Sequence, residues 1–374
     1  MGTVKNHQAA EPKGRKPVQH RDAQFGEATE EDERSEVIPF KYSITSYGAD
    51  YTVDGLVKRI NEKSVFVPSF QRGYVWKPEE ASRFVESLLL GLPVPGIFLS
   101  KEKESQRLLV IDGQQRLVTL QSFYRGMFPD EKLFKLCNVQ KRFLDKTYKT
   151  LEESDRIALD DSILHATIVK QDNPQEDNSS VYYIFERLNT GGVRLESQEI
   201  RACVYHGALN DLISALNRNE AWRTLYGHIS KKMRDQEMIL RFFALYSDGE
   251  SYKEPMKAFL NDYMSHNRNL AGNDAIRLTN LFTKSAELVS RAIGPKAFKP
   301  ARSFNAAVCD SVLVGVARRL TRGPLVGDDK SVVSQYRSLL DNGQYVDAAK
   351  TGTGQEEKVR TRLTLATNAF SKAK

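Results

Sequence analysis

Apolar residues recur at helical spacing over most of the chain, and the exceptions are a few strand-like runs in its first half. In YTVDGLVKRINEK, the apolar residues from Val53 to Ile60 fall on one face, which predicts a short helix. The next run, SVFVPSFQRGYVW, is rich in β-branched and aromatic residues, which favours a strand. Because proline cannot donate to a sheet ladder, Pro68 limits that run to an edge strand or a loop.

A helix with signals at both ends follows in KPEEASRFVESLLLG. Pro78 suits the first helical turn, and Glu79 and Glu80 complement the positive end of the helix dipole. Gly91 fits the position just after the last helical residue. LPVPGIFLS and RLLVI then predict two strands, and QQRLVTLQSFYRG predicts a helix closed by Gly126.

The order of these elements predicts an α+β first half and an all-α second half. HATIVK is one more candidate strand, QDNPQEDNSS has the composition of a loop, and almost everything beyond Val181 has helical periodicity. We therefore place an α+β domain at 38–175 and a helical domain at 176–374. Residues 1–37 are polar and nearly free of large apolar groups, which predicts a disordered or loosely attached tail.

The composition limits the cellular compartments in which the protein is expected. No stretch reaches the roughly 18 apolar residues that a membrane helix needs, so we expect no membrane association. The N-terminus has no apolar core of a secretory signal. Cys137, Cys203 and Cys309 are too far apart for a disulfide framework or a zinc knuckle. This pattern suits a reducing compartment, and we expect a cytoplasmic protein.

The positive charge is concentrated at the C-terminal end. The formal net charge is +7, and residues 281–374 contain 16 Lys or Arg against eight Asp or Glu. Such a surplus attracts phosphate polymers through counterion release, so DNA is the expected partner of this last quarter. The alternative is an ordinary solvated helical surface.

The stretch VIDGQQRLVTLQSF places four polar residues and a glycine, Asp112 to Arg116, between a buried strand and a helix. A helix N-terminus presents unpaired N–H groups and a partial positive charge, which bind phosphate. The fork of Arg116 matches phosphate oxygens, and Gly113 lets the backbone approach a ligand closely. Gln114 and Gln115 can orient a water or a base edge. The structural alternative is a common Asp-Gly turn at a helix start.

Two further clusters contain residues that could also contribute to a phosphate-binding site. SFQRGYVW contains a second Gln-Arg pair, Gln71 and Arg72, which could converge with the first on one anion. Tyr74 could stack on a base, although core packing explains such aromatics equally well and is favoured for Trp76.

The third cluster lies in ERLNTGGVRLESQEIR. Asn189, Thr190 and the N–H groups of Gly191 and Gly192 could close over a phosphate or a sugar. Ser197 is the expected N-cap of the next helix. The alternative is a simple connector between helices.

Together these clusters resemble the N-terminal domain family of GmrSD-type modification-dependent restriction systems, domain of unknown function family 262. The similar segments are FVPSFQRGYVW, LLLGLPVPGIFL, LLVIDGQQRLVTLQSFYRG and YYIFERLNTGGVRLESQEIRACVYHG, within roughly Val53 to His206. The resemblance implies a ParB/sulfiredoxin-like nucleotide-binding fold. It also implies NTP binding and hydrolysis tied to DGQQR, and action on phage or otherwise modified DNA.

Carried over to this chain, the resemblance places Asp112, Gly113, Gln114, Gln115 and Arg116 around the nucleotide, with Gln71 and Arg72 opposite. Asp112 would bind Mg²⁺ or polarise water, Gln115 would orient that water, and Arg116 would clamp phosphates. We expect an NTPase that uses Mg²⁺, with GTP or UTP as candidate nucleotides.

One departure from the family affects the expected activity. Many relatives carry a His-Asn-His nuclease with a His-x-x-Pro element, and none of the six histidines here begins one. No Walker A, HExxH or GxSxG motif is present either. Two alternatives to the NTPase remain open: a DNA-binding sensor or regulatory subunit that works with a separate nuclease subunit, and a DNA nicking endonuclease. The sequence leaves the oligomeric state open, with a homo-oligomer among the options.

Overall fold

The fold is given by a computed structural model, which describes residues 43–67, 74–102, 105–173, 179–188, 195–325 and 329–373. The predicted tail, 1–37, lies outside these residues. Among them, no helix is both long enough and apolar enough to cross a membrane.

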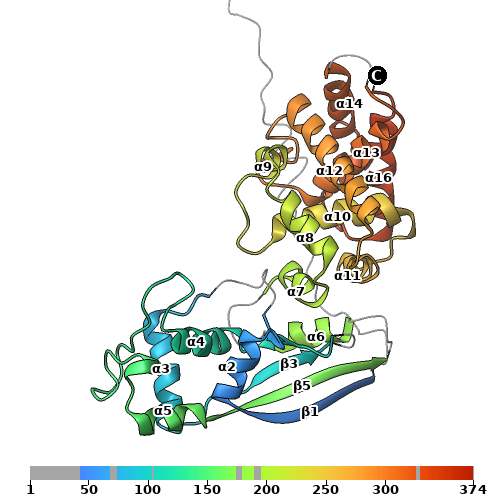
Figure 1. The fold of residues 1–374 in the computed structure, drawn as a ribbon. Coiled ribbons are helices and arrows are strands. Elements are labelled where there is room, and N and C mark those ends of the chain that lie inside the picture. The colour runs from blue at the N-terminus through green and yellow to red at the C-terminus, as the bar shows by residue number, and fades with distance from the viewer. Residues whose placement is uncertain are drawn as a thin grey trace, which may run out of the picture.

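A mixed five-stranded sheet forms the base of the molecule, with strand order β1-β5-β3-β4-β2 (Figure 1). β2 runs parallel to β4 and β3 parallel to β5, whereas the β3–β4 and β1–β5 pairs are antiparallel. The strands are β1 (Ser43–Thr52), β2 (Val65–Phe66), β3 (Ile97–Lys101), β4 (Leu108–Asp112) and β5 (Ile163–Asn173).

Period-2 alternation along β4 separates the two faces of the sheet. Leu108 and Val110 belong to one hydrophobic core, together with the four helices of the α+β part. Ile111 belongs to a second core, which it shares with α6 and the helices that follow. The four helices are α2 (Val53–Asn61), α3 (Pro78–Leu89), α4 (Gln114–Arg125) and α5 (Glu153–Asp160).

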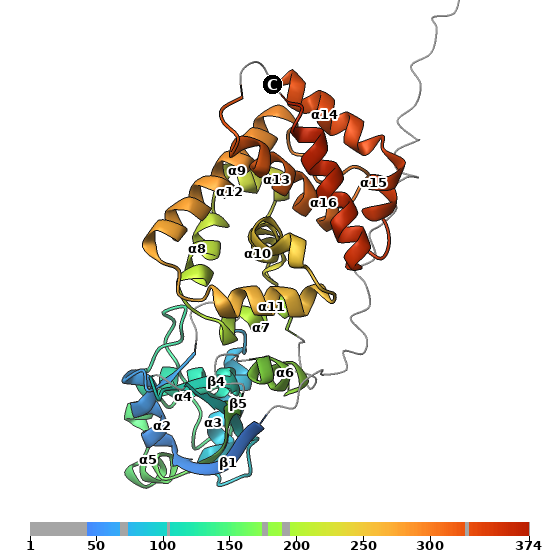
Figure 2. The same ribbon diagram turned by 90° about the vertical axis from the view of Figure 1, so that its right-hand side faces the viewer.

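Most of the described residues from 179 onward are helical, and from α8 onward they form the upper part of the molecule in Figures 1 and 2. α6 and α7 lie at the junction with the sheet. The helices are α6 (Ser179–Leu188), α7 (Ser197–Val204), α8 (Ala208–Leu216), α9 (Glu220–Tyr226), α10 (Arg234–Asp248), α11 (Met256–His266), α12 (Gly272–Ala292), α13 (Ala306–Leu320), α14 (Lys330–Leu340), α15 (Gly343–Ala348) and α16 (Glu356–Phe370).

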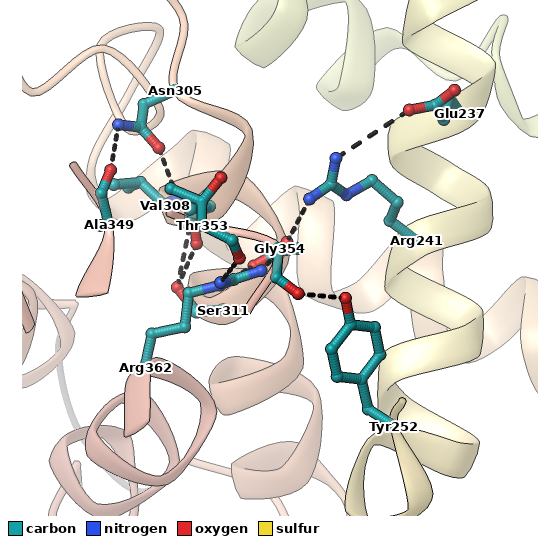
Figure 3. Close-up of polar contacts among 12 residues, drawn as sticks. Glu237, Arg241, Tyr252, Asn305, Val308, Ser311, Ala349, Thr353, Gly354 and Arg362 are labelled. Atoms are coloured by element: carbon teal, nitrogen blue, oxygen red, sulfur yellow. Dashed lines mark hydrogen bonds and ion pairs between the residues drawn. The ribbon is translucent and has the colours of Figure 1, made fainter. Parts of the chain in front are cut away.

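A charged network is buried at the centre of the helical part. Asp310 on α13 and Arg362 on α16 are both fully buried, and their side chains make two parallel hydrogen bonds of 3.0 and 2.9 Å. Arg241 reaches the same carboxylate from α10, with Nη2 3.3 Å from Oδ2. Figure 3 shows Arg241 and Arg362 approaching from opposite sides, with Glu237 beyond Arg241.

The predicted α+β part followed by a helical region is confirmed. Pro78 begins α3, and Gly91 and Gly126 follow α3 and α4 with φ of +66° and +82°, as the end signals predicted. The first helix begins later than YTVDGLVKRINEK suggested, because Tyr51 and Thr52 still belong to β1. β1 itself gave no strand signal, since this edge strand is largely exposed and shows no apolar alternation.

Candidate functional site

The DGQQR turn joins the end of β4 to the start of α4. Gly113 is the N-cap residue, with φ of +99° in the left-handed region. A Cβ atom at Gly113 would lie 2.4 Å from Ile97 Cγ2 and 3.4 Å from Arg116 Nε. Because both the dihedral and the space exclude a side chain, this turn requires glycine.

Asp112 and Arg116 form an ion pair across this turn. Arg116 Nη2 donates to Asp112 Oδ2 at 2.7 Å, and Nη1 donates to the Pro95 carbonyl at 3.3 Å. The side chain of Arg116 is 13% exposed, whereas that of Asp112 is 42% exposed. The guanidinium is therefore held in place from both sides, and the carboxylate is the more accessible partner.

The Gln115 side chain binds the backbone of a neighbouring segment, Val75 and Trp76, and holds it beside the turn. Its Oε1 accepts hydrogen bonds from the backbone N–H groups of Val75 at 2.9 Å and Trp76 at 3.3 Å. A water oriented by this oxygen would compete with those two donors. The catalytic role of Gln115 therefore stays a prediction beside a positioning role that the structure shows.

Tyr74 is also anchored on α4. The Thr119 hydroxyl donates to the Gln115 carbonyl at 2.7 Å, so the Tyr74 hydroxyl, 2.8 Å from Thr119 Oγ1, acts as donor to Thr119. Burial raises the pKa of Tyr74. The described part of the SFQRGYVW segment, from Tyr74 onward, therefore lies against α4. Gln71 and Arg72 lie outside the described residues.

The aromatic residues of that segment pack on neighbouring side chains. The Trp76 and Phe84 rings meet edge to face with centroids 5.6 Å apart, in the packing role expected for Trp76. The Tyr74 ring lies 6.1 Å from the Phe128 ring. A base-stacking role for Tyr74 remains a prediction.

The third predicted cluster, Asn189, Thr190, Gly191 and Gly192, lies outside the described residues. The helix that follows it, α7, begins at Ser197 with Glu196 as its N-cap, so the prediction of Ser197 as N-cap was wrong. The reason is that the Glu199 carboxylate accepts the Glu196 N–H at 2.8 Å, which places the cap one residue earlier.

A charged cluster that the sequence did not reveal links the two parts of the molecule. Glu102, at the end of β3, lies 2.9 Å from His206 Nε2 and 3.4 Å from Arg268 Nη2, both in the helical part. Arg107 approaches the same carboxylate at 3.4 Å. These partners are far apart in sequence, so no local pattern could pair them.

This cluster predicts an acid-sensitive contact. Burial alone would raise the pKa of Glu102, but hydrogen bonds from His206 and Ser105 and the charges of His206 and Arg268 lower it from 4.5 to about 2. Because the unfolded chain takes up this proton near pH 4.5, the stabilisation is present above that pH and is lost as the pH falls toward 2.

We therefore expect Glu102→Gln to lower the thermal unfolding midpoint at pH 7 and to matter progressively less below pH 4.5. Thermal unfolding of both proteins between pH 7 and pH 3 measures this. A difference between the two midpoints that stays constant over that range would contradict the assignment.

Asp112 is the predicted ligand of Mg²⁺. Within the described residues, no group of three or more His, Cys, Asp and Glu side chains is arranged to hold a metal ion. Mg²⁺ at nucleotide sites commonly uses one or two carboxylates and takes its other ligands from phosphates and water. The partly exposed carboxylate of Asp112 fits that mode of binding, with the nucleotide as co-ligand.

A comparison with protein families matches the part of the chain that contains this site. Residues 53–206 match the family model described as GmrSD restriction endonuclease, N-terminal domain. This segment includes the DGQQR turn and α2 to α7, and it is a domain of that family. The domain indicates a component of a restriction or phage-defence system. No curated protein matches the chain.

Proposed function

We propose that this chain binds an NTP at the DGQQR turn and hydrolyses it, as a component of a restriction or phage-defence system acting on foreign or modified DNA. The observation that carries the proposal is the Asp112–Arg116 ion pair, placed around an obligatory glycine at the N-terminus of a twelve-residue helix. Helix N-termini and Arg forks are both suited to phosphate.

Each side chain of the turn has a distinct role in this proposal. Arg116 binds phosphate oxygens, and its bond to the Pro95 carbonyl keeps its orientation while it does so. Asp112 would hold the Mg²⁺ of the nucleotide, and that ion would supply charge stabilisation to the phosphate oxygens. Gln115 keeps the Val75–Trp76 backbone beside the site through Oε1. In this proposal it also orients the attacking water, which would compete with those two backbone donors.

DNA is the proposed partner of the basic C-terminal quarter. Not all of the surplus cations are available to it, because Arg362 is buried with Asp310 and Arg319 donates to the Ala373 carbonyl at 2.7 Å. The exposed cations that carry the proposal include Lys284, Lys296, Arg302, Arg322, Arg337 and Arg360. Their contribution would weaken with rising salt.

A separate nuclease subunit is the second part of this proposal, because none of the six histidines begins a His-x-x-Pro nuclease element. A sensor that binds nucleotide without turning it over, and a nicking enzyme, are the two competing functions. A cytoplasmic location and a homo-oligomeric state are compatible with each of them.

The test is phosphate release from the full chain with each of the four NTPs and Mg²⁺, with and without DNA. We expect turnover that falls by about a hundredfold or more in Arg116→Ala, as for loss of a charge-stabilising donor. Arg125→Ala is the matched control, because Arg125 lies on the same helix and pairs with Glu131 while its side chain is 57% exposed.

The same samples separate the competing functions. Nucleotide binding without turnover in the wild-type protein would favour the sensor. Mg²⁺-dependent nicking of supercoiled plasmid would favour the endonuclease. Equal turnover in wild type and Arg116→Ala would exclude DGQQR as the hydrolytic site.

A further inference from the structure

A cavity lies between the sheet and the helical part, beside the β2 edge. Its volume is about 560 Å³, which is within the range of small-molecule sites. Its walls come from both parts of the chain: Lys63, Phe66, Arg107 and Leu117 on one side, His206 and Asp211 on the other.

The wall of this cavity combines an aromatic ring with a guanidinium that lies over it. The Arg107 guanidinium lies over the Phe66 ring at 4.5 Å from its centroid, and the His206 ring meets Phe66 edge to face at 5.4 Å. The side chain of Arg107 is still 44% exposed. A guanidinium that lies over an aromatic ring and stays partly exposed can also stack on another planar group, such as a nucleobase.

The charges around the cavity favour an anionic ligand. Lys63 is exposed at the rim, and with Arg107 it outweighs the one lining carboxylate, Asp211. Glu102 also pairs with Arg107 at 3.4 Å, but this carboxylate is shared with His206, Arg268 and Ser105. With Arg268 included, three cations face the two carboxylates Glu102 and Asp211. Apolar residues supply the rest of the lining, so the site combines a stacking surface with cations at its rim.

We propose that this cavity binds a nucleotide unit, with the base stacked on Arg107 and the phosphate near Lys63. The inference goes beyond the DGQQR site. Arg107 and Asp112 lie at opposite ends of β4, about 16 Å apart at 3.3 Å per strand residue, so one nucleotide monophosphate unit does not span both. The unit could belong to a free nucleotide or to a DNA strand.

The experiment uses the full chain carrying Arg116→Ala, so that the DGQQR turn does not contribute. One probe is 2-aminopurine ribonucleoside triphosphate, and the other is a single-stranded DNA decamer with one central 2-aminopurine. Stacking quenches 2-aminopurine fluorescence. Quenching by only one probe identifies the source of the nucleotide, and quenching that substitutions in the cavity weaken supports the site.

Two added substitutions locate the binding. Arg107→Gln is expected to weaken the quenched complex about tenfold, as for loss of one base-stacking contact. Lys63→Asn removes the rim charge and is expected to weaken it about threefold. Asparagine tolerates the φ of +59° at this position, so this exposed variant keeps the test valid if Arg107→Gln does not fold.

Arg83→Gln, at an exposed position on α3, is the matched control and should leave the affinity unchanged. No quenching by either probe would overturn the proposal. Equal affinities in Arg107→Gln, Lys63→Asn and Arg83→Gln would also overturn it. All of these proteins carry Arg116→Ala, so neither result bears on the proposed function of the DGQQR turn. The phosphate-release assay tests that function separately.

Discussion

Asp310→Ala is expected to lower the free energy of unfolding by about 3–5 kcal/mol, because it leaves two arginines in the core without their shared carboxylate. Arg362 is fully buried and donates to both oxygens of Asp310, at 3.0 and 2.9 Å. Arg241 donates to the same group, and its side chain is only 12% exposed. Chemical denaturation of the two proteins, followed by circular dichroism, measures the loss.

The chain contains a matched control for this prediction. Asp329 accepts two hydrogen bonds from Arg291, at 2.8 and 3.0 Å, so this pair has nearly the same geometry as the buried one. Here, however, the arginine and aspartate side chains are 64% and 33% exposed. Asp329→Ala should therefore lower stability by at most about 1 kcal/mol.

The contrast between these two pairs isolates the effect of burial. If both substitutions lowered stability equally, the burial argument would fail. In Asp310→Ala/Arg362→Met, the apolar replacement of Arg362 should recover part of the loss, since much of it comes from the unpaired buried charge.

Gly113→Ala is expected to lower nucleotide affinity and turnover by about a hundredfold, the scale found when reacting groups are misplaced by about 1 Å. The new Cβ would lie 2.4 Å from Ile97 Cγ2, so either the strand or the turn must move. Movement of the turn would displace Asp112 and Arg116. Isothermal titration with NTP and a phosphate-release assay measure the two effects.

Gly126→Ala is the control at the other end of the same helix. Gly126 also has a positive φ, +82°, but a Cβ there would meet nothing within 4 Å. Both variants should lose about 1–2 kcal/mol of stability through the unfavourable dihedral. Gly113→Ala should lose more through its close contact with Ile97, and only Gly113→Ala should lose nucleotide binding. Comparable binding in both would show that the close approach to Ile97 has no functional role.

Local patterns predicted the elements around the site well. The Pro and Gly signals defined the ends of α3, and the strand-to-helix transition at DGQQR appears where the sequence placed it. These features depend on neighbouring residues only. β1 was missed because its exposed residues have no apolar alternation, and its place in the sheet depends on pairing with β5 more than 100 residues later.

The predicted roles within the site were harder to derive. Gln115 was expected to orient water. The structure adds hydrogen bonds from the Val75 and Trp76 backbone to its side chain, and Val75 lies 40 residues earlier in the sequence. Lys and Arg counts predicted a basic C-terminal surface, but they could not reveal that Arg362 is buried beside Asp310.

The sequence alone determined the α+β and helical parts, the DGQQR turn between a strand and a helix, and the resemblance to a restriction family, because each depends on local spacing or on a contiguous motif. The structure added that Gly113 is required at this turn, because its φ is positive and Ile97 lies close. Tertiary structure decided which charges are paired and which are exposed. It also decided that Glu102, His206 and Arg268 meet, and that a cavity forms between the two parts. Those outcomes depend on contacts between distant segments, where burial rather than residue type sets the energy of each charge.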